Sequence, residues 1–180
     1  FVSRGLGDVY KRQDVDFLNK HPFVKFAIPI SLGDNYKSYR IVGTTNDLIE
    51  SLYKSTLFIG DFFSKPYDLV AGYNVAKKLN LKIGDTFFGS HGISSSTHQH
   101  HDSKYRIVGI LNSSGEVIDN LLLTPLESVW SAHMDNHQKG SFDLKNKKDY
   151  EHKHNHNNTE KGKEITACLV NYSTPRAKFS

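Results

Sequence analysis

The sequence has a single cysteine and no long apolar run. Cys168 cannot form a disulfide within the chain, and its apolar neighbours in "ITACLV" predict a buried thiol. No segment reaches the roughly 20 apolar residues that a membrane helix needs. The motifs H-E-x-x-H, C-x-x-C and G-x-S-x-G are missing, and "GDNYKS" has Tyr36 where a phosphate-binding loop needs glycine. These absences argue against an enzyme with a familiar catalytic motif.

The first 13 residues are set aside from the fold. The string "SRGLGDVYKRQ" (3–13) is what a transposase-based sequencing adapter encodes when it is read in frame. We therefore expect the natural chain to begin near Asp14, so that 14–180 is a fragment. Removing Arg4, Lys11, Arg12 and Asp8 leaves 20 basic and 18 acidic residues, which lowers the formal charge from +4 to +2. A balance this close to neutral removes most of the support for nucleic-acid binding.

Apolar patterning predicts alternating strands and helices. Residues 22–34 and 36–45 have the composition of two antiparallel strands, with Gly33-Asp34-Asn35 as the turn between them. Apolar residues at helical spacing predict helices in three places: 46–55 behind Asn46, 68–81 behind Asp68, and 125–137 with Pro125 in its first turn. Further strands are predicted at 86–90, 105–109, 117–124 and 164–173.

The composition changes sharply between 138 and 163. This stretch is rich in Lys, Asn, His and Gly and nearly free of aliphatic residues. Such a segment cannot bury enough apolar surface to offset its ordering entropy, so we expect a disordered insertion there. The remaining elements predict an α+β fold with mixed or antiparallel sheets, a few packed helices and two small lobes.

Histidine is the one residue type whose clustering suggests chemistry. Candidate metal ligands fall in three groups: His91, His98, His100, His101 and Asp102; His133 and His137; and His152, His154 and His156. Imidazole binds Zn²⁺, Cu²⁺ and Ni²⁺, and two histidines four residues apart on a helix share one face. The alternative is that these are solvated loop residues. Weak metal capture fits the loop tracts, whereas a catalytic metal needs ligands held by a second layer of contacts, which Ser- and Gly-rich loops lack.

Several stretches together resemble a known family. They are "AIPISLGDNYKSYRIVGTT", "VAGYNVAKKLNLKIGDTFFGSHG", "YRIVGIL" with "EVIDNLLLTPLESVW", and "EITACLVNY", in that order along 14–180. This set is similar to the extracytoplasmic core domain of FtsX-like, MacB-type ABC transporter permeases. Within that family, the His-rich loops resemble those of a branch linked to zinc transport.

The resemblance implies a mechanical role without catalysis. Such permeases lie in the bacterial cytoplasmic (inner) membrane, with this domain on the periplasmic side between one membrane helix and three more. They work as homo- or heterodimers, a separate cytoplasmic subunit hydrolyses ATP, and a periplasmic partner protein receives the motion. The family implies no catalytic residue and no required cofactor, although the histidine loops could bind Zn²⁺.

Two other functions stay open from the sequence alone. The first is a free-standing periplasmic zinc-binding protein, for which the complete gene would encode a signal peptide and no membrane helices. The second is a metallohydrolase, which needs three converging ligands and an open fourth position. Both depend on the same histidine clusters.

Overall fold

Eight strands form one mixed sheet in the computed structural model, which describes residues 11–89, 104–131 and 165–173. The strands are β1 (Val24–Tyr36), β2 (Tyr39–Thr44), β3 (Leu57–Gly60), β4 (Asp68–Ala71), β5 (Thr86–Phe88), β6 (Lys104–Leu111), β7 (Leu122–Pro125) and β8 (Ala167–Tyr172). Their order is β3-β6-β4-β7-β2-β1-β8, and β5 pairs with β6. The β2–β7 and β4–β6 pairs are parallel and the others antiparallel, which confirms the predicted α+β class.

The β1–β2 hairpin confirms the two predicted strands but not their turn. The chain reverses at Lys37 and Ser38, whose φ angles are 45° and 72°, and Tyr36 pairs with Tyr39. Two positive φ angles in a two-residue turn match the twist of the flanking strands. The predicted turn residues Gly33-Asp34-Asn35 instead continue β1 through an irregularity in register. Gly33 is needed there because a Cβ would lie 2.9 Å from the Val129 side chain.

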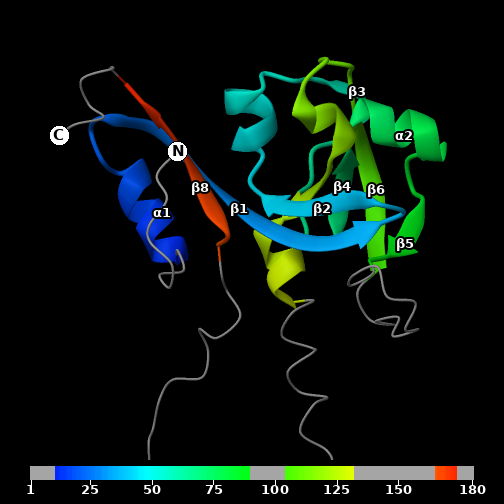
Figure 1. Ribbon diagram of the computed structural model, residues 1–180, viewed down its shortest axis with the longest axis horizontal. Coiled ribbons are helices and arrows are strands. Elements are labelled where there is room, and N and C mark those ends of the chain that lie inside the picture. Colours follow the sequence, from blue (N-terminus) through cyan, green and yellow to red (C-terminus); the bar gives the residue numbers. More distant parts are fainter. Residues whose placement is uncertain (1–10, 90–103, 132–164, 174–180) are drawn as a thin grey trace, which may run out of the picture.

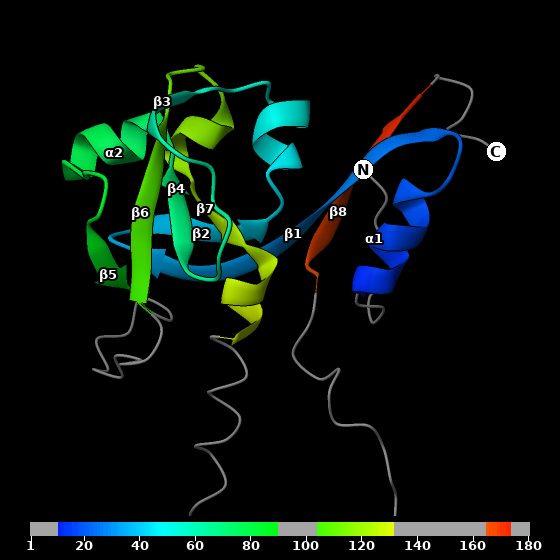
Figure 2. The same cartoon turned by 180° about the vertical axis from the view of Figure 1, so that it is seen from behind.

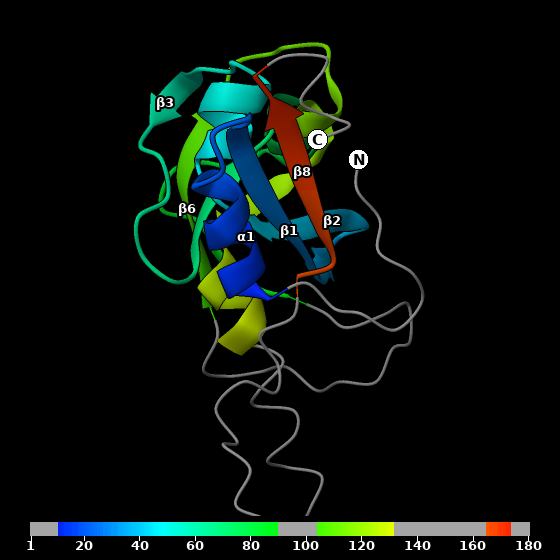
Figure 3. The same cartoon turned by 90° about the vertical axis from the view of Figure 1, so that its left-hand side faces the viewer.

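The long strand β1 joins two parts of the molecule (Figure 1), and Figure 3 shows it between α1 and β8 on one side. Its first half pairs with β8, from Val24 to Ile30, and its second half pairs with β2. On the side of β1 away from β8, side chains bond the backbone groups that a neighbouring strand would otherwise bond. Asn19 bonds both the N–H and the carbonyl of Ala27, and the Thr44 hydroxyl donates to the Pro29 carbonyl. Pro29 has no N–H to satisfy, so every backbone group on this side of residues 27 and 29 has a partner.

The predicted helix 68–81 is wrong in its first half. Asp68–Ala71 is the fully buried strand β4, and only Tyr73–Leu79 is helical (α2). Leu69 and Val70 are enclosed on both sides of the sheet, so burial overrides the helical spacing. The residue before the helix, Gly72, must lack a side chain, because a Cβ there would lie 2.3 Å from the Ile118 carbonyl oxygen.

Three other elements differ from the predictions in type or extent. The helix predicted at 46–55 is a short π-helix, η1 (Leu48–Leu52), and the predicted strand 117–124 begins as a 3-10 turn, η2 (Val117–Asn120). The helix expected from Pro125 begins at Leu126 and is described to residue 131. A helix that was not predicted, α1 (Arg12–Asn19), begins within the residues set aside as adapter sequence.

Three apolar clusters hold these elements together. One packs Ile28, Val42 and Leu123 under η1, and the second packs Leu69, Val75 and Tyr105 under α2. The third joins α1 to β8 and the helix at 126–131, and it contains Trp130 and Cys168. Cys168 is only 1% exposed, which confirms the predicted buried thiol.

Candidate interaction surface

The proposed metal ligands lie outside the described residues. His91, His98, His100, His101 and Asp102 fall in 90–103, and the other five histidines fall in 132–164. The structure therefore neither brings these side chains together nor separates them. The one histidine that it does describe, His21, packs its ring 5.6 Å from the ring of Phe23.

The segments that flank these histidines share one end of the molecule. The end of β5, the start of β6, the end of the helix at 126–131 and the start of β8 all face the same way in Figures 1 and 2. Only the described ends of these elements are placed by the structure, and the histidines themselves lie outside the described residues. In the part of the chain that the structure describes, no group of three His, Cys, Asp or Glu side chains could hold a metal.

The buried Asp68 carboxylate stabilises the fold. Its Oδ2 accepts hydrogen bonds from the backbone N–H groups of Ser64 and Lys65, at 3.2 and 3.0 Å. Its Oδ1 pairs with Arg106 at 3.3 Å. Burial alone would raise the pKa of Asp68, but these donors together lower it. The group is thus an anion that closes the turn before β4, and it has no open side for a substrate.

Asp119 has the same role on the loop after β6. It is 1% exposed and accepts bonds from the N–H groups of Ser114 and Gly115 and from the Ser114 hydroxyl, at 2.8 to 3.1 Å. Burial acts to raise the pKa of Asp119, and the bonds from Ser114, Gly115 and Ser113 outweigh it and lower the pKa.

The buried Cys168 thiol and Tyr105 hydroxyl are poor nucleophiles. Burial raises the pKa of the Cys168 thiol, so the reactive thiolate is disfavoured at neutral pH. Burial, and then the nearby Asp34 and Tyr67, raise the pKa of Tyr105. Both groups are therefore held in their protonated, unreactive form.

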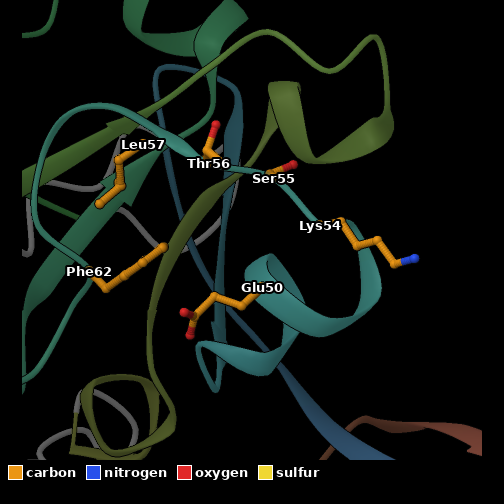
Figure 4. A pocket seen from close by; sticks show the side chains of 6 residues that line it. All are labelled: Glu50, Lys54, Ser55, Thr56, Leu57 and Phe62. Carbon is orange, nitrogen blue, oxygen red and sulfur yellow. The ribbon is translucent and has the colours of Figure 1, made fainter.

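A surface groove lies between η1 and β3 (Figure 4). It encloses about 370 Å³ and is lined by Glu50, Lys54, Ser55, Thr56, Leu57 and Phe62. The Glu50 carboxylate points toward Phe62, whereas the Lys54 side chain points away from the other lining residues. Ser55 is buried, and its hydroxyl has no hydrogen-bond partner. The groove therefore combines one carboxylate with an apolar wall.

Exposed apolar side chains continue this groove along the sheet edge. Phe58 and Ile59 on β3 are 68% and 51% exposed. Ile83 is also exposed and lies beside Gly60, since a Cβ on Gly60 would meet its Cδ1 at 2.8 Å. We call the groove together with Phe58 and Ile59 the η1–β3 face. Sequence patterning missed it, although the short apolar run "LFIG" between polar segments was its one signal.

The helices predicted at 68–81 and 125–137 offer little exposed apolar surface where the structure describes them. Residues 68–71 are buried strand, and in the helix that begins at Leu126 the side chains of Leu126, Val129 and Trp130 are all in the core. Among the residues that the structure describes, the largest apolar exposures on the sheet edge belong to the η1–β3 face.

Comparison with known proteins shows what this fold is similar to. No family model matches the chain, and no curated protein matches it. The periplasmic region of MacB from Actinobacillus actinomycetemcomitans matches with a TM-score of 0.51 and 15% identity, over 69% of this chain and 59% of that one. The extracellular domain of the noncanonic ABC-type transporter YknZ from Gram-positive bacteria matches with a TM-score of 0.55 and 12% identity, over 94% and 77%.

These matches establish a shared fold. The chain spans less than two thirds of the MacB region and about three quarters of the YknZ domain. Both neighbours are periplasmic or extracellular domains, and the resemblance drawn from the sequence is confirmed at the level of the fold. No helix within 11–89, 104–131 or 165–173 has the length and hydropathy of a membrane span.

Proposed function

We propose that this chain is the extracytoplasmic domain of an ABC transporter permease subunit and that it transmits ATP-driven motion to a periplasmic partner or substrate. The observation that carries the proposal is the fold shared with the extracellular domain of an ABC-type transporter over 94% of the chain. In this proposal the subunit lies in the bacterial inner membrane as part of a permease homo- or heterodimer. A cytoplasmic subunit hydrolyses ATP, and this domain has no catalytic role.

The strand β1 suits the domain to carry force. It has 13 residues, which corresponds to about 40 Å of continuous strand. Its first half belongs to the β8 side and its second half to the β2 side, so a push on one part reaches the other through covalent backbone. A hinge would need a flexible joint between the parts, whereas hydrogen bonds hold β1 along its length. The two parts should therefore move as one body.

Helix α1 is the element through which a preceding membrane helix would act. The Asn19 side chain accepts from the Ala27 N–H at 2.7 Å and donates to the Ala27 carbonyl at 3.0 Å. The Asn19 bonds fix the end of α1 to β1, so displacement of the helix would displace the strand.

The complete gene tests this proposal. The sequence on either side should encode one membrane helix before the domain and three after it, and the protein should fractionate with membranes. Protease added to spheroplasts should cut within the domain but leave cytoplasmic markers intact. A complete gene without apolar helices would refute the proposal and favour a free-standing periplasmic protein.

Zinc capture by the histidine loops is a second proposed property. Its support is the histidine content, together with the described elements before and after both histidine segments, whose ends face one side of the fold. In this proposal the imidazoles of 91–101, 133–137 and 152–156, with Asp102, bind Zn²⁺ outside the membrane. The metal is not required for folding, because the described core is closed by apolar clusters and paired carboxylates.

Calorimetric titration with Zn²⁺ tests this property. The native chain is compared with a variant in which the histidines of 98–101 and 152–156 are replaced by serine. The proposal expects a binding heat that is lost or greatly reduced in the variant, while the thermal unfolding of both apo proteins stays the same. Equal heats for the two proteins would refute it.

A further inference from the structure

The η1–β3 face is protected against the simplest kind of association, which is the addition of another strand. Leu57 pairs with Leu111 and Ile59 with Ile110, so Phe58 forms a bulge that interrupts the edge of β3. The Asn112 side chain also donates to the Leu57 carbonyl at 3.1 Å and to the Thr56 hydroxyl at 2.8 Å. Bulges and occupied acceptors prevent strand addition. Any partner at this face must therefore bind through side chains.

The charges on this face are unused within the described fold. Glu50 and Lys54 are both exposed, and neither forms an ion pair with another described residue. The Glu50 carboxylate faces into the groove beside Phe62, and the Lys54 ammonium extends outward (Figure 4). A groove with a carboxylate and an aromatic wall suits a basic side chain, because both groups attract a cation.

The η1–β3 face also contains a basic side chain that could bind in such a groove. A two-fold contact places each residue against a different residue of the second copy, so a surface must be self-complementary to make one. Here Lys54 supplies the cation, Glu50 supplies the acceptor, and the exposed Phe58 and Ile59 on β3 add apolar area to the same face. Protein interfaces combine such apolar area with charged groups.

We propose that the η1–β3 face binds the same face of a second copy of this chain, with Lys54 of each copy entering the Glu50 groove of the other. The inference rests on the proposed function, in which two permease subunits hold their outer domains close together. Tethering raises the effective concentration, so a contact that is weak between free domains is populated in the assembly.

Charge reversal on the 180-residue chain tests this inference. Four proteins are compared by sedimentation velocity over a wide concentration range: native, Glu50→Lys, Lys54→Glu and the double reversal. Each single reversal replaces two symmetry-related attractions by repulsions and should weaken dimerisation about tenfold. The double reversal restores both pairs and should restore dimerisation. Thermal melts check that all four proteins fold alike.

A cross-link provides a more sensitive readout for a weak contact. Ile59→Cys introduces the only accessible thiol of the described residues, because Cys168 is buried. Oxidation should give a covalent dimer in the native-charge and double-reversed backgrounds and little in either single reversal. Failure of the double reversal to restore association, dimerisation insensitive to charge, or no dimer by either method would each overturn the inference. The flanking gene still decides the permease assignment, so the two failures are distinguishable.

Discussion

Replacing Asp119 tests whether a buried carboxylate holds the loop after β6. This side chain is 1% exposed and accepts three strong bonds from Ser114 and Gly115. Net contributions of bonds to a charged group run from about 1.5 to 3 kcal/mol and do not add fully. Asp119→Ala should therefore lower the free energy of unfolding by about 3 kcal/mol. Asp119→Asn, which keeps one acceptor oxygen, should cost roughly half as much.

Urea unfolding followed by tryptophan fluorescence measures this change, because Trp130 is the only tryptophan and lies in the core. The pKa of Asp119 is lowered in the folded protein. Its contribution is therefore complete above the unfolded pKa, about 3.9, and is lost as pH falls through the lower folded value. The gap between native and Asp119→Asn proteins should begin to narrow below about pH 4 and should close only below the lower folded pKa.

Asp85 provides the matched control for this experiment. Its Oδ2 accepts one bond from the Lys82 N–H at 2.8 Å, but the residue is exposed. Water can replace that bond, so Asp85→Ala should cost less than about 1 kcal/mol. Equal losses at the two positions, or a gap for Asp119→Asn that is independent of pH, would refute the reasoning.

Three further experiments, two of them with a control substitution, probe the fold. Asn19→Ala removes both bonds to Ala27 and should speed hydrogen exchange of the Ala27 amide more than that of Ile28; unchanged exchange would mean that α1 is held by other contacts. Gly72→Ala should destabilise the protein by more than about 2 kcal/mol, since the Cβ meets the Ile118 carbonyl, whereas Gly84→Ala should cost only about 1 kcal/mol for its positive φ. Asp68→Ala should lower the melting temperature much more than Arg106→Gln does, because the Asp68 carboxylate is buried while the Arg106 side chain is largely exposed. Equal decreases in melting temperature for the two variants would contradict this.

The sequence predicted strands best where local pattern and burial agree. The hairpin of β1 and β2, the strand at β6 and the strand at β8 follow from alternating or apolar runs bounded by turn residues. The turn of the β1–β2 hairpin was predicted wrongly because Gly33 is needed for close packing against Val129, which lies far away in the sequence. The same limit explains Asp68–Ala71, where burial on both sides of a sheet cannot be read from spacing that also fits a helix.

The interaction surface was harder to predict than the fold. The η1–β3 face combines residues from a π-helix, an edge strand and the segment after it, and no single pattern marks them. Its groove arises because Ser55 turns back to bond the Ile49 carbonyl and Lys54 takes a φ of 50°. The histidine clusters were visible in the sequence, but their positions lie outside the described residues, so their metal binding stays a prediction.

Pro29 has a consequence for how the chain finds its fold. A strand that exchanges partners halfway along could slide by two residues and keep its apolar pattern, which is a common source of misfolded pairing. A slide in one direction would place the Pro29 nitrogen, which has no N–H, in the stretch that bonds β2. A slide in either direction would move the Pro29 carbonyl away from the Thr44 hydroxyl that donates to it. The β8 pairing ends at Ile30 and the β2 pairing begins at Ser31, so Pro29 lies next to the exchange of partners and disfavours a shifted register there.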